Sequence, residues 1–270
     1  MIEKLRQIVS GRFTLLKMLV LGIRFVFTKP DKRMGKYKNK YLGKRCFIIG
    51  LGPSLRISDL EKLEEKKEIC FSVNKIYELF QYTKWRPDFY FISDYRAVTE
   101  ETGRNIDDMT ENHRTSVFYT KNAAIDMNKK AIRCRVFDIY NPLHNTRSLF
   151  LKERARHVCL AKDAGKYIYD GVTCITSAIQ LAYYMGFKQV YLLGCDCGAS
   201  KGQQYAEGLR DHGDCIYGNQ IEKILFDSYI SLKKDIEKKG IDFKIYNATR
   251  GGLLDVFERV DFDEFMDNAL

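Results

Sequence analysis

The stretch KRCFIIGLGPSL, Lys44–Leu55, decides the fold class of this 270-residue chain. Its apolar part, Cys46–Ile49, is a continuous hydrophobic run, which is typical of a strand buried on both faces of a mostly parallel sheet. Turn-forming residues then end the strand, and Ser54 is a suitable N-cap for a helix that begins near Leu55. The stretch therefore predicts the opening of an α/β domain.

The turn after this strand contains Gly50, Gly52 and Pro53, and it predicts a site for an anionic group. Glycines let a ligand approach the backbone, and the N–H groups at a helix start attract anions such as phosphate. The turn has neither the GKS or GKT of a Walker loop nor the full GxGxxG spacing of a dinucleotide fingerprint. A second interpretation stays open, in which the turn closes a core strand and binds nothing.

The charge of the chain is concentrated at its start. The net charge is +10 and 45% of the residues are hydrophobic, which suits one large domain with an N-terminal appendage. Residues 1–45 hold thirteen Lys or Arg against Glu3 and Asp31, a net of +11, so the other 225 residues sum to −1. We therefore expect no nucleic-acid partner for the folded part.

We predict that residues 1–43 form a leader and that residues 44–270 form a Rossmann-like catalytic domain. The apolar run Phe13–Phe27 is interrupted by two basic residues and is too short to span a bilayer, which takes about 20 residues. No small-residue cleavage site follows it, so a signal peptide is not indicated. The basic residues between 29 and 40 favour an anionic membrane surface.

This leader is predicted to be an amphipathic interfacial helix with a polybasic tail, peripheral at the cytoplasmic face of the cell membrane. Lipid-linked acceptors would lie at that face. An alternative is a helix that packs on its own domain or on a partner subunit, and a homo-oligomer is considered with it.

The eight cysteines indicate reduced thiols in a cytosolic protein, because no spacing of a small disulfide-bonded domain is present. One group could supply four zinc ligands: Cys195, Cys197, His212 and Cys215. The CxC spacing is not a common zinc-binding spacing, and Cys195 lies where a predicted strand ends. No metal is therefore expected.

Three predicted strands each end at a polar residue. The strands are Ile69–Val73, Phe89–Ser93 and Gln189–Leu193, and the residues close after them include Asn74, Asp94 and Asp196. Ligands in open α/β sheets bind beyond the carboxyl ends of the strands, so these side chains predict one crevice. Asn74 can equally be a turn or cap residue. Asp94 is followed by Tyr95 and not by a second carboxylate, which favours a site that handles phosphate without a metal cage.

The rest of the pattern alternates helices and strands. Helices are predicted at Ile57–Lys67, from Ile76, at Thr173–Met185 and at Gln220–Lys239, with further strands near Phe118, at Cys134–Ile139 and at Phe243–Tyr246. Gly171 lies at the opening of the third of these helices, and Gly186 is expected to end it.

The segment 199–219 is polar, glycine-rich and dotted with aromatic residues, as expected of an active-site loop. It holds Tyr205, His212 and Tyr217. A second irregular segment, Asn141–Lys166, is interpreted as a basic insertion or lid.

Four separated segments carry a resemblance to a known family. The runs FIIGLGPSL, LAYYMGFKQVYLLGCD and GQQYAE, together with Asn74, resemble the bacterial sialyltransferases that decorate lipooligosaccharide. The glycine turn and the MGF-YLLG-D unit are also similar to the wider 6-hydroxymethylpterin diphosphokinase-like domain family. The ending IYNATRGGLLDVF is similar to members of that second group.

The sialyltransferase resemblance implies a Rossmann-like sheet that binds a CMP-sugar without a metal. It also implies tyrosines that hold the departing phosphate and a histidine that takes the proton of the acceptor hydroxyl. The nucleotide-binding residues expected on this chain are Gly50, Gly52, Pro53, Ser54, Asn74, Asp94, Gly171, Asp196, Thr249, Arg250 and Gly251.

The same resemblance implies that Tyr205 is the first phosphate-binding tyrosine and that His212 is the catalytic base. The chain departs from the family pattern at two places. Asp211 stands where the second tyrosine is expected, so Tyr217 is the substitute, and the histidine position falls nearest to Asn219. A neutral histidine accepts a hydroxyl proton near pH 7, and phenols stabilise charge on a phosphate.

The predicted function is that of a metal-independent inverting glycosyltransferase in bacterial surface-polysaccharide synthesis. Its donor is a nucleotide-activated sugar of the CMP-linked, sialic-acid-like type, its acceptor is a glycan or glycolipid, and it needs no cofactor. Two alternatives stay open. One is a Mg-ATP-dependent 6-hydroxymethylpterin diphosphokinase, and the other is a non-catalytic nucleotide-binding subunit of a glycan-assembly complex.

Overall fold

The computed structural model describes residues 30–93, 100–113, 115–120, 130–134, 136–137, 158–169, 171, 173–198, 205–209 and 221–268. The elements are, in chain order, η1 (Lys32–Tyr37), β1 (Arg45–Ile49), α2 (Ile57–Glu65), β2 (Cys70–Val73), η2 (Asn74–Gln81), β3 (Phe89–Ile92), α3 (Glu100–Glu111), β4 (Ser116–Tyr119), β5 (Ile132–Arg133), β6 (Val136–Phe137), β7 (Ile168–Tyr169), α6 (Cys174–Tyr184), β8 (Gln189–Leu193), α7 (Ile221–Lys238), β9 (Lys244–Asn247), β10 (Glu258–Arg259) and α8 (Phe262–Asn268).

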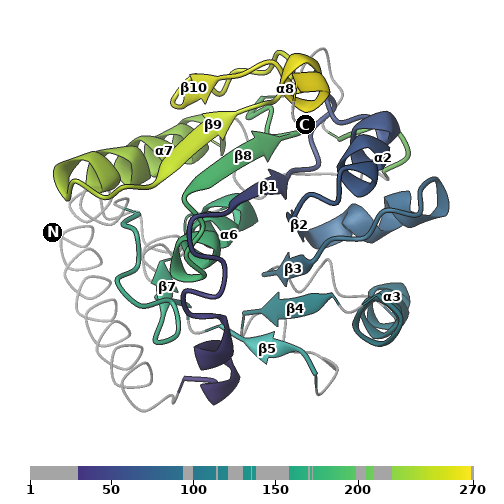
Figure 1. The fold of residues 1–270 in the computed structure, drawn as a ribbon, viewed down its shortest axis with the longest axis horizontal. Helices are drawn as coiled ribbons and strands as arrows, with labels where there is room; N and C mark the ends of the chain where they lie inside the picture. Colours follow the sequence, from purple (N-terminus) through teal and green to yellow (C-terminus); the bar gives the residue numbers. More distant parts are fainter. Residues whose placement is uncertain are drawn as a thin grey trace, which may run out of the picture.

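An eight-stranded sheet in the order β10-β9-β8-β1-β2-β3-β4-β5 organises the fold (Figure 1). Every pairing in this sheet is parallel. A separate parallel pair joins β6 and β7. The predicted α/β class with a mostly parallel sheet flanked by helices is confirmed.

The central strand β1 has apolar side chains on both faces. Cys46 and Ile48 belong to one core cluster, and Phe47 and Ile49 belong to the other. All four side chains are fully buried. Because successive strand residues point to opposite faces, a strand covered on both sides needs this unbroken apolar run.

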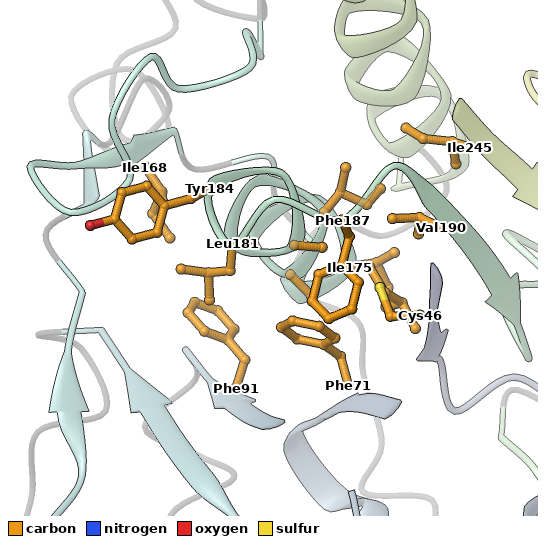
Figure 2. Packing of buried hydrophobic residues seen from close by; sticks show 14 of the residues in the cluster. Cys46, Phe71, Phe91, Ile168, Ile175, Leu181, Tyr184, Phe187, Val190 and Ile245 are labelled. Carbon is orange, nitrogen blue, oxygen red and sulfur yellow. The ribbon is translucent and has the colours of Figure 1, made fainter. Parts of the chain in front are cut away.

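Helices cover the two faces of the sheet unequally. Residues of α6 and α7 pack in the first cluster, and residues of α2, η2, α3 and α8 pack in the second. Figure 2 shows α6 lying over the first face, with Phe71 of β2 and Phe91 of β3 directed at the helix. Val190 of β8 contributes to the same layer. These contacts fix α6, whose first turn lies at the carboxyl edge of the sheet.

The sequence explains both ends of α6. Thr173 is its N-cap and accepts a hydrogen bond from the Ile175 amide at 3.3 Å, which satisfies one of the free N–H groups of the first turn. Gly186 has φ +91°, a conformation that favours glycine and ends a helix. The helix predicted at Thr173–Met185 is confirmed within one residue at each end.

The strand order reverses at β1. The chain adds β2, β3, β4 and β5 on one side of β1 and then returns to place β8 and β9 on the other. In open parallel sheets, ligands bind outside the carboxyl ends of the strands at such a switch point. The topology therefore predicts a ligand site at the turns that follow β1 and β8.

The helix predicted at Ile57–Lys67 is confirmed, because α2 begins at Ile57. Two other local predictions were wrong. No helix begins near Leu55, and the N-cap of α2 is Arg56, whose amide donates to the Asp59 carboxylate at 3.0 Å. Ser54 is not an N-cap, because its hydroxyl is used elsewhere. The helix predicted from Ile76 is instead a 3₁₀ helix that begins at Asn74 and ends at Gln81. The strand predicted at Cys134–Ile139 contains β6, and residues 138 and 139 lie outside the described part of the chain.

Residues 30–43, which the sequence analysis assigned to the leader, pack on the domain. Met34 and Tyr37 are buried in the first core cluster. The Tyr41 ring stacks on Phe187, with ring centroids 4.9 Å apart. Residues 1–29 lie outside the described part of the chain, and within the described part no helix is long and apolar enough to cross a membrane.

Candidate functional site

The turns after β1 and β8 are joined by backbone hydrogen bonds. The Gly50 amide donates to the Leu193 carbonyl at 2.7 Å, and the Gly52 amide donates to the Gly194 carbonyl at 2.8 Å. Gly194 has φ +65°, so the second turn also depends on glycine. The two turns therefore form one surface at the switch point of the sheet.

Packing of the protein explains why the first turn needs glycine. A Cβ at Gly50 would lie 3.0 Å from the Cys195 sulfur, and a Cβ at Gly52 would lie 2.8 Å from Cγ of Asp196 and 2.8 Å from the Gly194 carbonyl oxygen. The sequence pattern predicts that these glycines leave space for a ligand. In the structure, protein atoms fill the space that a side chain would take.

Asp196 fixes this pair of turns from the β8 side. Its Oδ2 accepts a hydrogen bond from the Ser54 hydroxyl at 2.8 Å and a longer one from the Ser54 amide at 3.4 Å. The residue is only 5% exposed. Burial raises the pKa of the Asp196 carboxyl, while the Ser54 hydrogen bonds and the charge of Arg259 act in the opposite direction.

Asn74 occupies the carboxyl end of β2, as predicted. Its φ is +45°, and its carbonyl oxygen accepts a hydrogen bond from the Tyr90 hydroxyl. Its side-chain Oδ1 accepts from the Cys174 thiol at 3.3 Å. The Cys174 sulfur also lies 2.7 Å from the Ser93 hydroxyl. The ends of β2 and β3 and the first turn of α6 thus meet at one polar cluster.

Tyr205 lies beside the first turn, although 150 residues of chain separate them. The amide of the next residue, Ala206, donates to the Leu51 carbonyl at 2.9 Å. The Tyr205 ring lies under the Lys75 ammonium, with 5.1 Å between Nζ and the ring centroid. The structure therefore brings together the glycine turn, the residues at the end of β2 and the predicted phosphate-binding tyrosine.

The sequence matches the model of a known protein family. A family model described as 6-hydroxymethylpterin diphosphokinase MptE-like matches residues 25–202, more than half of the sequence. The chain belongs to the MptE-like family. The resemblance to the 6-hydroxymethylpterin diphosphokinase-like domains is thereby confirmed, and no curated protein matches the chain.

One similar solved structure is that of the MAf glycosyltransferase from Magnetospirillum magneticum AMB-1. The two chains are 16% identical, with a TM-score of 0.48, over 85% of this chain and 37% of that one. The MptE-like chain thus spans well under half the length of this neighbour.

Three residues of the MptE-like domain that the sequence analysis did not assign lie at the candidate site: Lys75, Ser93 and Cys174. Lys75 could have been found, because it directly follows a polar residue at a predicted strand end. Ser93 ends the predicted strand Phe89–Ser93 in the same way. Cys174 carried no signal, because only the fold places the start of α6 beside the ends of β2 and β3.

The predicted residues beyond β9 hold the MptE-like fold together. Thr249 is buried, and its hydroxyl accepts a hydrogen bond from the Cys195 amide at 3.0 Å. The Gly251 carbonyl accepts from Arg259 at 2.7 Å. The loop that contains both residues is therefore tied to the turn after β8.

Arg250 is engaged with two carboxylates. Its guanidinium donates to Asp59 at 2.8 Å and to Asp263 at 2.7 Å, and it lies over the Phe262 ring at 5.2 Å. Asp59 is fully buried. These contacts join α2 to α8 and to the loop after β9. Hydrogen bonds to both acids raise the pKa of Arg250 against the opposing effect of burial.

Gly171 lies just before α6 and is buried. A Cβ there would lie 2.7 Å from Cβ of Thr176, so packing against the first turn of α6 requires glycine. The remaining predicted site residues, Asp94, His212 and Tyr217, lie outside the described part of the chain, as does Cys215 of the considered zinc set. Among the described residues, no group of three or more His, Cys, Asp or Glu could hold a metal ion.

Proposed function

We propose that this chain is a transferase that binds a nucleotide-activated sugar at the carboxyl edge of its sheet and transfers the sugar with inversion. The observation that carries the proposal is the meeting of the Gly50–Ser54 turn, Lys75 and Tyr205 at the switch point. Membership of the MptE-like family supports a phosphate-handling transferase.

Lys75 and Tyr205 have the chemistry that a departing nucleotide phosphate requires. When the bond between the sugar and the phosphate breaks, negative charge develops on a phosphate oxygen. An ammonium and a phenolic O–H near that oxygen stabilise the charge, and they do so more strongly where water is excluded. In this proposal the two side chains supply what a divalent cation supplies in other transferases.

The proposed transfer is a single displacement. An acceptor hydroxyl oxygen forms a bond to the anomeric carbon as the bond from that carbon to the phosphate oxygen breaks, and the hydroxyl proton passes to a base. His212 is the proposed base, because a neutral imidazole accepts a proton near pH 7. Tyr217 is proposed to assist Tyr205 at the phosphate.

The donor is proposed to be CMP-linked, and the acceptor to be a glycan or glycolipid at the inner face of the cell membrane. This part of the proposal is supported by the resemblance of the glycine turn, Asn74 and the GQQYAE run to sialyltransferases.

A second candidate function is a Mg-ATP-dependent diphosphokinase for a pterin-like alcohol. The description of the matching family favours it. In that reaction the chain would transfer a diphosphate group from ATP, with Mg²⁺ bridging the phosphates. The same carboxyl edge would hold the nucleotide, so the two candidates differ in ligand and metal requirement and not in location.

Thermal-shift titration of the full chain with CMP, CDP, UDP and ATP, each with and without magnesium, tests the proposal. A ligand that binds only the folded state raises the melting temperature as its concentration exceeds the Kd. Stabilisation by CMP without metal is the expected result. Stabilisation only by ATP with magnesium would favour the diphosphokinase over the glycosyltransferase. No response to any nucleotide would contradict both candidate functions.

A variant at Lys75 tests the proposed contact with the nucleotide phosphate in the same assay. Replacing it in Lys75→Ala is expected to weaken CMP binding about 10-fold, because a charge-assisted contact to phosphate is lost. Lys84→Ala, at an exposed lysine away from the turn, is the matched control and should leave the affinity unchanged. Tyr205→Phe keeps the ring under Lys75 and removes the hydroxyl, so it should lower the transfer rate more than the affinity.

A further inference from the structure

The amino edge of the sheet, opposite the candidate site, is lined by residues 30–44, which we call the amino-edge segment. Arg33 donates to the Ala131 carbonyl just before β5, and Tyr37 donates to Ser116 at the start of β4. Lys44 precedes β1 and accepts a hydrogen bond from the Lys188 amide just before β8. The segment therefore runs along the beginnings of four strands (Figure 1).

This segment presents an excess of exposed positive charge. It contains six Lys or Arg residues and one acidic residue, Asp31. The side chains of all six basic residues are exposed. Asp31 is paired with Arg33 at 2.6 Å. Within the described residues, no carboxylate lies within ion-pair distance of the other five, which are Lys32, Lys36, Lys38, Lys40 and Lys44.

Other acidic groups near the same edge do not neutralise these lysines. Glu68 is bound to Arg45, and Asp242 is bound to Lys188 at 2.6 Å. Both of these carboxylates are thus paired with a basic side chain. Among the described residues, no carboxylate is paired with the lysines of the amino-edge segment, and their charge suits an anionic partner.

The fold holds part of this charge in place. The Lys36 ammonium lies 4.9 Å from the Tyr37 ring centroid, and the Lys40 ammonium lies 5.4 Å from that of Tyr41. Tyr37 is buried, and the main chain is anchored by the Asn39 and Tyr41 amides, which donate to carbonyls at the end of α6. The lysines therefore project from a fixed backbone, so less conformational entropy is lost when they bind.

An apolar side chain stands among the lysines. Leu42 is 67% exposed, the highest value among the large hydrophobic residues that the structure describes as exposed. It lies between Lys40 and Lys44, and Gly43 beside it has φ +76°. An exposed leucine with a lysine two residues before it and another two residues after it suits a surface that is anionic at its face and apolar just beneath it.

We propose that the amino-edge segment is a docking surface for an anionic lipid membrane. Lysine attracts an anionic leaflet as a point charge, and each one near the surface contributes to binding. Nucleic acid is the less suitable partner, because five of the six cations are lysines, not arginines that bind phosphate bidentately, and because Leu42 has no role on a phosphate backbone. The sequence of residues 1–29, which precede the segment, is apolar and basic.

This docking surface sets the orientation of the candidate site. All eight strands are parallel and run from the amino edge toward the Gly50–Ser54 turn. The five residues of β1 span about 17 Å at the usual rise per residue. A chain docked by the amino-edge segment therefore holds its candidate site on the side of the sheet away from the lipid, so the glycolipid acceptor of the proposed function would reach the site with the end of its glycan.

Vesicle cosedimentation of the full chain tests the docking surface. The vesicles contain phosphatidylcholine alone or with phosphatidylglycerol, and a short single-stranded RNA serves as the competing polyanion. The double variant Lys32→Glu/Lys38→Glu changes two lysines that make no ring contact, so folding should be preserved. We expect it to lower partitioning onto anionic vesicles by at least about 30-fold, the effect of losing two lysine charges alone.

Two further variants separate lipid binding from general anion binding. Arg56→Glu/Arg104→Glu makes the same change in net charge at exposed residues outside the segment and should leave partitioning nearly unchanged. Leu42→Ser should weaken vesicle binding about 10-fold, because buried CH₂ groups are lost, and should leave RNA binding unaltered.

Partitioning that is unchanged in Lys32→Glu/Lys38→Glu, or lowered equally in the control pair, would overturn the proposal. So would tight RNA binding that the lysine variant abolishes while vesicle binding persists. Circular dichroism melting of each variant establishes that it is folded before binding is measured.

Discussion

The two edges of the sheet differ in whether their polar side chains bind other protein groups or are exposed. At the carboxyl edge, polar side chains bind one another: Ser54 donates to Asp196, and the Thr249 hydroxyl accepts from the backbone of the turn after β8. At the amino edge, the lysines of residues 30–44 point outward and are not paired with carboxylates in the described part of the chain. Polar side chains at the carboxyl edge thus stabilise the local fold, whereas the lysines at the amino edge are exposed.

This difference separates residues that build a site from residues that contact a partner. Sequence patterns mark both kinds, because glycines, aspartates and arginines near strand ends look the same whether they bind a ligand or each other. The contacts in the structure distinguish them. Lys75 and Tyr205 are the carboxyl-edge residues whose chemistry best suits a phosphate.

The largest effect is expected when Arg250 is removed. The buried Asp59 would lose its cation, so Arg250→Ala should lower the free energy of unfolding by about 3 kcal/mol. Chemical denaturation measures this change. The double variant Asp59→Asn/Arg250→Ala should be less destabilised than the single one, because no buried charge is left unpaired.

CMP affinity of folded Arg250→Ala distinguishes a structural residue from a ligand-binding one. An unaltered affinity is expected from the observed contacts with Asp59 and Asp263. A large loss of affinity with little loss of stability would place Arg250 among the ligand-binding residues and contradict its assignment to the residues that stabilise the fold.

A smaller effect is expected at the glycine turn. In Gly52→Ala the added methyl group would collide with Asp196 and with the Gly194 carbonyl, and such overpacking costs about 2 kcal/mol. Adding Asp196→Ala should recover part of this loss, which a double-mutant cycle would measure as coupling. Gly103→Ala in α3 is the control, since no atom lies within 4 Å of its Cβ position, and it should stabilise by up to about 1 kcal/mol.

The smallest effect is a change in pH dependence at Asp196. Because burial raises the pKa of this carboxyl, the native state binds more protons than the unfolded state at pH values above the ordinary Asp pKa of about 3.9. The contribution of Asp196 to stability is therefore full below that pKa and falls as pH rises through the native value. Asp196→Asn does not titrate and can still accept from Ser54, so its stability relative to the unmodified chain should increase over this window. A difference that stays flat with pH would contradict the raised pKa.

The sheet could be predicted from the sequence because its signals are local. The run Cys46–Ile49 predicts a strand buried on both faces, and Gly186 predicts the end of α6. The role of Ser54 could not be predicted, because its partner Asp196 is 142 residues away. The same holds for Lys75, whose contact with Tyr205 exists only in the folded chain.

Residues 30–43, which composition assigns to a leader, pack on the domain through a few apolar side chains. Alternating lysines gave the segment the composition of a solvated tail, yet Met34 and Tyr37 between them are buried. A cation-rich segment can pack through a few apolar residues and still expose every charge, because lysine side chains extend beyond the surface they cover.

The central claim is that a nucleotide binds at the carboxyl edge, beside the joined turns of β1 and β8. Amide chemical-shift mapping of the full chain during titration with CMP tests it most directly. The account predicts that the largest shifts fall on Gly50–Ser54, Lys75 and Ala206, and that residues 30–44 are unaffected. Shifts centred on residues 30–44, with the Gly50–Ser54 turn unchanged, would contradict it.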